Sequence, residues 1–136
     1  MDNFREFKAG PDPFGRTYQI WFKYLQTAIS IRHSDSVDVC FILESGGLHS
    51  GGETPERIEK TVVIPNADIR AYSKRTGRPV NDAWCSRLAM CKLRLVIETA
   101  EDIEKHYLPV TLKEIEEYDG LIKKWEQDWA KKKHAA

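Results

Sequence analysis

The sequence has few of the residues that carry recognisable chemistry. Its 136 residues include 3 cysteines and 4 histidines. None of them forms a C-x-x-C pair or a histidine pair one helical turn apart, the spacings typical of metal and redox sites. Neither a G-x-S-x-G nor a phosphate-loop pattern occurs. We therefore expect no metal and no cofactor, and the sequence identifies no catalytic residues and favours a non-enzymatic function.

An excess of charge of either sign is also missing, because Lys+Arg and Asp+Glu both number 21. A general attraction to nucleic acid or to a membrane surface is therefore not indicated. No apolar run approaches the roughly 18 residues of a membrane-spanning helix, and the opening MDNFREFK lacks the apolar stretch of a signal peptide. An odd cysteine count without such a signal indicates reduced thiols. We expect a cytoplasmic protein with no membrane partner.

What is present is a core-forming composition, 41% hydrophobic and 31% charged, at the length of one domain, residues 1–136. Residues 1–16 are rich in proline and glycine, which predicts an extended lead-in. Residues 27–43 alternate around a polar turn at 33–36 and predict a β-hairpin, and Thr61–Ile64 predicts a short strand before Pro65. One alternating set is predicted to face the core: Tyr18, Ile20, Phe22 and Tyr24.

Helical signals follow Pro65. Asn66 or Asp68 is expected to cap a short helix, Asn81 or Asp82 a second helix over 83–98, and Thr99 with Asp102 a shorter one ending before Pro109. Buried positions in the second helix are predicted to be Trp84, Leu88, Cys91 and Leu95. Thr111 and Glu114 form a capping box that opens a last helix running to about Lys133. The order predicts an α+β fold, with a three- to four-stranded antiparallel sheet (17–64) followed by three to four helices on one face.

Charge is segregated along this neutral chain. Residues 69–97 hold 7 basic groups and 1 acidic group, whereas residues 98–119 hold 2 basic and 8 acidic groups. One interpretation is that the two blocks face each other in the fold. The alternative is an anion-binding patch where the short helix ends and the next begins. Its members would be Arg70, Lys74, Arg75 and Arg78.

The last helix carries a regular apolar stripe. Its members step by three and four residues: Ile115, Tyr118, Ile122, Trp125 and Trp129. Periodicity leaves core packing and a dimer or partner interface both open. A helix of this length spans roughly 30 Å, more than strands of five to eight residues, so we expect Trp125 and Trp129 to overhang the sheet and to be buried by a partner chain.

A glycine-rich segment at 46–52 separates two predicted strands. A phosphate-binding loop would instead lead from a strand into a helix. We therefore interpret the segment, together with His49, as an exposed hairpin loop, and we expect residues 45–57 to tolerate deletion.

The leading hypothesis is a cytoplasmic protein-interaction or ligand-binding module that acts through its helical layer and is homodimeric. A second hypothesis is an anion or nucleic-acid binder that uses the basic stretch 70–94, with Tyr72 and Trp84 for stacking. A third is a small α+β enzyme with a pocket between sheet and helices lined by Tyr18, Tyr24 and Trp84.

Overall fold

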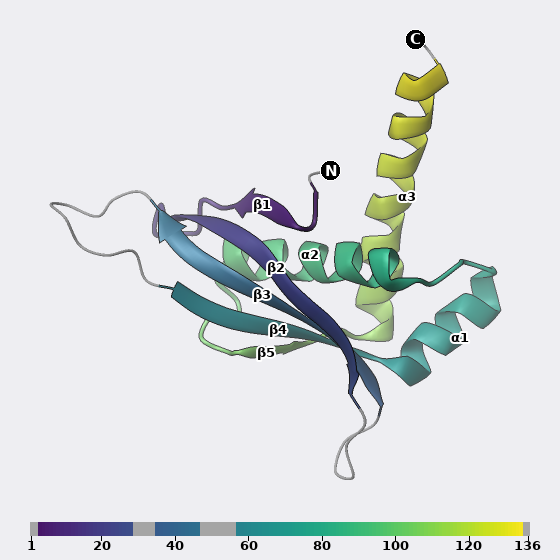
Figure 1. Ribbon diagram of the computed structural model, residues 1–136, viewed down its shortest axis with the longest axis horizontal. Helices are drawn as coiled ribbons and strands as arrows, with labels where there is room; N and C mark the ends of the chain where they lie inside the picture. The colour runs from purple at the N-terminus through teal and green to yellow at the C-terminus, as the bar shows by residue number, and fades with distance from the viewer. Residues whose placement is uncertain (1–2, 29–34, 47–56, 135–136) are drawn as a thin grey trace, which may run out of the picture.

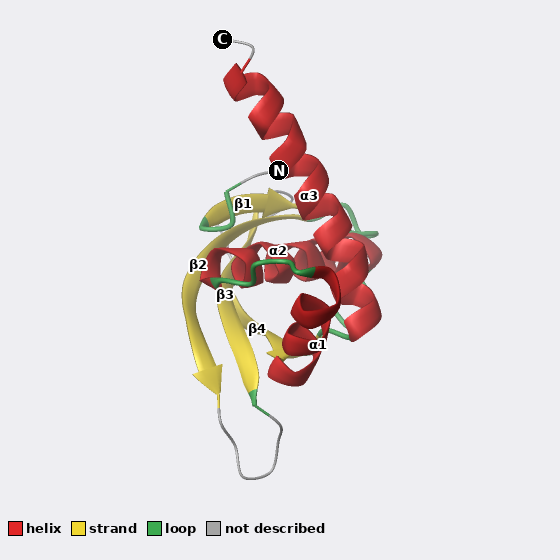
Figure 2. Ribbon diagram, turned by 90° about the vertical axis from the view of Figure 1, so that its right-hand side faces the viewer, coloured by secondary structure: helices red, strands yellow, loops and turns green. Residues whose placement is uncertain are grey.

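The computed structural model describes residues 3–28, 35–46 and 57–134. The glycine-rich loop after Gly46, including His49, and the first half of the turn at 33–36 lie outside these residues. Figures 1 and 2 show a twisted sheet with all three helices on one of its faces, which confirms the α+β class. The elements are β1 (Glu6–Ala9), β2 (Thr17–Ala28), β3 (Ser36–Gly46), β4 (Arg57–Pro65), α1 (Asn66–Thr76), α2 (Asp82–Thr99), β5 (Tyr107–Pro109) and α3 (Leu112–His134).

The sheet is larger than the sequence predicts. Its five strands lie in the order β1-β2-β3-β4-β5, with β1 to β4 antiparallel and β5 parallel to β4. The prediction of three or four strands, all antiparallel, is therefore wrong. The sequence analysis expected an extended lead-in where β1 lies and a short helix before Pro109, where the structure instead has β5. Both missed strands are very short, and longer neighbours supply their hydrogen bonds; directly after β5, for example, the Val110 amide donates to the Val63 carbonyl of β4 at 2.9 Å.

A bulge in β2 changes which side chains reach the core. The register with β3 shifts between Phe22 and Tyr24. An extra residue reverses the alternation beyond it. Leu25 consequently lies opposite the buried Val39, whereas Tyr24 is 38% exposed. The prediction that Tyr24 shares the core face of Tyr18 and Ile20 is wrong for this reason.

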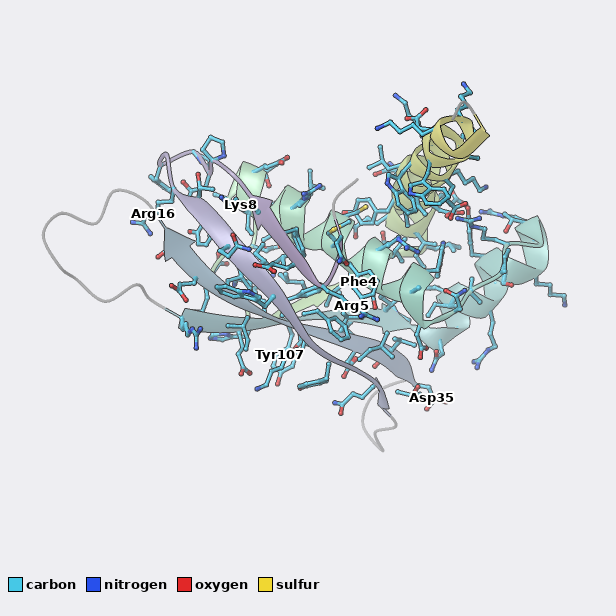
Figure 3. The ribbon with its side chains drawn as sticks, turned by 45° about the horizontal axis from the view of Figure 1, so that its top comes forward. Phe4, Arg5, Lys8, Arg16, Asp35 and Tyr107 are labelled. Carbon is cyan, nitrogen blue, oxygen red and sulfur yellow. The ribbon has the colours of Figure 1, made fainter. Side chains whose placement is uncertain are left out.

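No helix of the described residues packs on the opposite face of the sheet (Figure 2). Tyr107 projects from it and is 68% exposed (Figure 3). Ion pairs also lie on this face, such as Lys23 with Glu59, whose Nζ and Oε1 atoms are 2.5 Å apart. The buried apolar cluster lies instead between the sheet and the three helices.

Local signals set the helix starts. The Asn81 side chain accepts a hydrogen bond from the Trp84 amide at 2.8 Å, as predicted for α2. The capping box before α3 is also confirmed, because the Thr111 and Glu114 side chains each accept from the other's amide at 3.2 Å. Helix α1 is different: Pro65 occupies its N-cap position and offers no side-chain hydrogen bond, so the predicted caps are wrong.

The stripe of α2 is only partly buried. Trp84, Leu88 and Cys91 lie in the core as predicted, whereas Leu95 is 44% exposed. Helix α2 is apolar around most of its circumference, but the sheet covers one side and α3 crosses it toward one end (Figure 1). The C-terminal half of α2 therefore keeps one apolar side open, and the predicted burial of Leu95 is wrong.

Helix α3 extends well beyond the rest of the molecule (Figures 1 and 2). Its 23 residues span about 34 Å at 1.5 Å per residue. Ile115, Tyr118 and Ile122 are buried, Trp125 is half-buried and Trp129 is 52% exposed. Residues 112–122 are called the embedded half below, and residues 123–134 the overhang.

Candidate functional site

The two charge blocks meet each other across the helical layer. Of the four predicted anion-binding residues, Arg70 and Lys74 are exposed on α1. Arg75 pairs with Glu116 of α3, and Arg78 lies between Asp119 and Glu126 of α3. Because two of its four members face carboxylates, an anion at this patch would compete with α3. Anion binding here stays a prediction.

A fully buried carboxylate anchors α3 to the rest of the helical layer. Asp119 accepts hydrogen bonds from the Tyr72 hydroxyl at 2.5 Å, from Trp84 Nε1 at 2.9 Å and from Arg78 Nε at 3.1 Å. The remaining nitrogens of Arg78 bind both oxygens of Glu126, at 2.7 and 3.1 Å. A buried carboxylate with this many donors is stable as an anion and fixes the orientation of the helix that carries it.

The pKa directions agree with this anchoring role. Burial acts to raise the pKa of Asp119, but the hydrogen bonds from Tyr72 and Trp84 and the charge of Arg78 outweigh it, so the pKa is lowered. Burial, followed by the bond to Asp119, raises the pKa of Tyr72 to about 12. Both groups therefore keep one protonation state near neutral pH, which suits structure better than proton transfer.

A second clamp holds the first turns of α3 against α2. Glu114 Oε2 accepts from Lys92 Nζ at 2.7 Å and from the Tyr118 hydroxyl at 2.8 Å. Further along α3, the Arg87 guanidinium of α2 lies over the Trp125 ring, 4.7 Å from the ring centre. These contacts hold α3 at a fixed angle to α2 up to Trp125.

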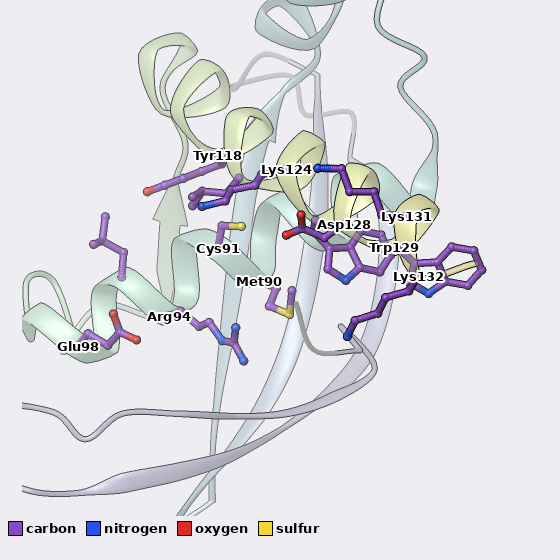
Figure 4. Close-up of a pocket in the computed structure, with 13 residues that line it drawn as sticks. Met90, Cys91, Arg94, Glu98, Tyr118, Lys124, Asp128, Trp129, Lys131 and Lys132 are labelled. Atoms are coloured by element: carbon purple, nitrogen blue, oxygen red, sulfur yellow. The ribbon is translucent and has the colours of Figure 1, made fainter. Parts of the chain in front are cut away.

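A groove of about 900 Å³ occupies the angle between α2 and α3 (Figure 4). Met90, Cys91 and Tyr118 are its buried members. Three large apolar side chains on it stay open to solvent, namely Leu95 at 44%, Leu121 at 55% and Trp129 at 52%. Its full lining is Met90, Cys91, Arg94, Leu95, Glu98, Tyr118, Leu121, Lys124, Trp125, Asp128, Trp129, Lys131 and Lys132.

Charged groups frame the apolar part of the groove. Four basic and two acidic side chains line it: Arg94, Lys124, Lys131, Lys132, Glu98 and Asp128. Arg94 is engaged within the chain, since its guanidinium lies 5.3 Å from the Phe7 ring centre and donates to the Lys8 carbonyl at 3.2 Å.

Burial raises the pKa of the Cys91 thiol to about 11, so this thiol is protonated and a poor nucleophile at neutral pH.

The predicted interface residues divide into two groups. Tyr118, Trp125 and Trp129 line the groove, whereas Ile115 and Ile122 lie in the core. The sequence interpretation missed Leu95 and Leu121. Leu121 directly precedes Ile122 of the stripe and lies on the side of α3 that faces the groove. Its apolar side chain next to the stripe is the sequence feature that could have identified it as a site residue.

The residues of the enzyme hypothesis do not converge. Tyr18 and Trp84 are buried in the core, whereas Tyr24 lies beyond the bulge and is partly exposed. The described cysteines are free thiols. Within the described ranges, no three His, Cys, Asp or Glu side chains group as metal ligands do, and no helix is long and apolar enough to cross a membrane.

Comparisons with protein-family models, with curated proteins and with solved structures find no match to this chain. The groove and the overhang therefore have to be interpreted from their own geometry. Two properties define them: an apolar surface left open on two helices, and a helix that continues past the domain supporting it.

Proposed function

We propose that the protein is a non-enzymatic interaction module that binds an amphipathic helix in the groove between α2 and α3. The observation that carries this proposal is the exposure of Leu95, Leu121 and Trp129 around one groove. Contiguous exposed apolar side chains with a charged rim are typical of interaction sites. The free thiols favour a reducing compartment, and we propose the cytoplasm.

A helix suits this groove better than a small molecule does. The groove is formed by two helices at an angle and is open along the overhang (Figure 4). A helix about 10–12 Å across can lay one apolar face into such a groove, with anchors three and four residues apart. The aromatic residues Trp125 and Trp129 provide rigid contact area of the kind that dominates binding energy.

The rim favours an occupant with acidic groups. Four basic and two acidic side chains line the groove, so complementary charges on the bound helix would be mainly negative. The test uses a synthetic amphipathic helical peptide with a leucine face and glutamates flanking it. Its control is a peptide of the same composition in scrambled order, which lacks the apolar face.

Binding is measured by tryptophan fluorescence and by amide chemical shifts, at a protein concentration of about 1 µM for fluorescence so that weak self-association is dissociated. We expect saturable binding with shifts at Leu95, Leu121 and Trp129. Leu121→Asp is expected to weaken it at least about tenfold, because a buried charge is costly. The matched control, Gln127→Asp, places the same charge at an exposed α3 position outside the groove lining. Equal binding by both variants would contradict the proposal.

A further inference from the structure

Helix α3 is charge-polarised along its length. Residues 112–119 contain one lysine and four acidic residues, whereas residues 123–133 contain five lysines and two acidic residues. In the embedded half, Glu114, Glu116 and Asp119 already pair with residues of α1, α2 or the segment between them. Glu117 is exposed on the helix surface. Because the other three carboxylates already pair within the chain, Glu117 is the acidic group of this half that can face the lysine-rich end of an antiparallel copy.

The apolar side chains of α3 show the same self-complementarity. In an antiparallel pair that crosses at Trp125, residues equally far before and after the crossing lie opposite each other. Leu121 then faces Trp129 of the second copy, four residues on either side. Tyr118 of one copy faces Lys132 of the other. Glu117 of the first copy faces position 133, next to that lysine. Both Leu121 and Trp129 are more than half exposed in the single chain, so each has surface available for this contact.

We propose that the helix bound in the groove is α3 of a second copy of this chain, packed antiparallel across a two-fold axis near Trp125. The inference rests on the proposed function, since it names the occupant of the same groove. Each overhang lies beside the embedded half of the other helix. The tip of each overhang reaches the open side of α2 where Leu95 and Glu98 line the groove.

The length of the overhang supports a second copy as the occupant. Between Trp125 and His134 the helix projects about 13 Å at 1.5 Å per residue, beyond the body of the domain in both views (Figures 1 and 2). The stretch from Leu112 to Trp125 spans about 20 Å along the same axis, so a crossing at Trp125 places the two bodies on opposite sides of the crossing, with each overhang beside the embedded half of the other helix. One isologous contact thus covers both overhangs and both grooves without requiring the domains to interpenetrate.

Sedimentation equilibrium of the intact 136-residue chain tests the oligomeric state. We expect a monomer–dimer equilibrium with a dissociation constant in the micromolar range, about 1–100 µM. Leu121→Asp should weaken the dimer at least about tenfold, because it places a charge in the apolar contact. Gln127→Asp, with the same charge at an exposed α3 position outside the groove, should not. A chain that stays monomeric at about 1 mM overturns the inference.

Charge exchange tests the antiparallel register. Glu117→Lys and Lys132→Glu should each weaken the dimer by about three- to tenfold, since the two-fold axis repeats each altered pair. The double variant restores opposite charges across the axis and should return the dissociation constant to within about twofold of the original. A dimer that the double variant fails to restore does not have this register, and the inference fails.

Cross-linking provides a test that does not depend on stability. Lys124 lines the groove next to the crossing, so Lys124→Cys should form a disulfide between two copies under mild oxidation. Gln127→Cys, an exposed position outside the groove lining, should not. Efficient cross-linking of both variants alike overturns the inference.

The peptide experiment distinguishes this inference from the proposed function. If the intact chain is monomeric but Leu121→Asp abolishes binding of the amphipathic peptide, the second copy is not the occupant and the interaction module stands. If the chain is monomeric and no peptide binds, both proposals fail. If the chain is dimeric and excess peptide dissociates the dimer, both are supported.

Discussion

The two halves of α3 continue one apolar pattern but have different surroundings. In the embedded half, Ile115, Tyr118 and Ile122 are buried, whereas seven residues after Ile122 the overhang leaves Trp129 more than half exposed. The step of three and four residues is unbroken between them. Periodicity therefore specifies which face of a helix is apolar, and the length of the supporting domain decides how much of that face is covered. The difference separates residues that stabilise the monomer from residues available to a partner.

The largest expected effect concerns the anchor of the embedded half. Asp119→Ala leaves Arg78, Tyr72 and Trp84 without their shared acceptor inside the helical layer. Removing one member of a buried charged network typically costs about 3–5 kcal/mol, and urea unfolding at neutral pH should show a loss of this size. Glu116→Ala removes an exposed pair with Arg75 and should cost less than about 1 kcal/mol. Equal losses would mean that the network does not anchor α3.

The next effect compares one apolar deletion in each half. Ile122→Ala opens a cavity at a fully buried position and should cost about 2–5 kcal/mol. Trp129→Ala removes a larger side chain from an exposed position and should cost less than about 1 kcal/mol in dilute protein. Thermal unfolding at micromolar and at millimolar concentration checks both. A large loss from Trp129→Ala in dilute protein would show that the overhang stabilises the monomer itself.

A third effect is the pH dependence of stability that follows from titration of Asp119. The pKa of Asp119 in the folded chain lies below its ordinary value of 3.8, because the donated hydrogen bonds and the charge of Arg78 outweigh burial. Its contribution to stability is therefore present above that ordinary value and is lost as pH falls through the lower, folded pKa. Glu114, whose pKa is lowered by Lys92 and Tyr118 despite burial, acts in the same direction.

Urea unfolding between about pH 5 and pH 2 measures this linkage. The unmodified chain should lose stability progressively across the interval. Asp119→Asn should be less stable at neutral pH and should lose less on acidification, because the titrating group is gone. Parallel pH profiles for the two chains would show that Asp119 titrates alike in the folded and unfolded states.

Local signals in the sequence specified much of this fold. The change from period two to helical spacing after Pro65, the Asn81 cap and the capping box at Thr111 and Glu114 each depend on residues close together in the chain. These were predictable because their hydrogen bonds close within a few residues. The short strands β1 and β5 were not, because a strand of three or four residues is stable only when a longer neighbour supplies its partners.

The candidate site was predictable only in part. The spacing of the apolar residues predicted the stripe of α3, and the length of the helix predicted its overhang. The opposed charge blocks indicated that the helices pair, but they did not specify that Arg78 would bind Asp119. The groove depends on the angle between α2 and α3, which side chains far apart in the sequence determine. For the same reason, Leu95 has the spacing of a core residue but lies on the open side of α2.

The smallest expected effect on the monomer comes from removing most of the overhang. A chain ending at Glu126 keeps Ile122, the Arg78–Glu126 pair and the stacking of Arg87 on Trp125. It loses Trp129 and the terminal lysines, which interact favourably with the negative end of the helix by only a few tenths of a kcal/mol each.

The shortened chain should therefore unfold within about 1 kcal/mol of the full chain when both are dilute. At high concentration it should lose both the dimer and the added stability that dimerisation gives, because the second copy contacts the overhang. Urea unfolding at two concentrations, together with sedimentation, checks this. A loss of several kcal/mol in dilute shortened protein would contradict the division of α3 into an embedded half and an overhang, and would make the overhang part of the folded core.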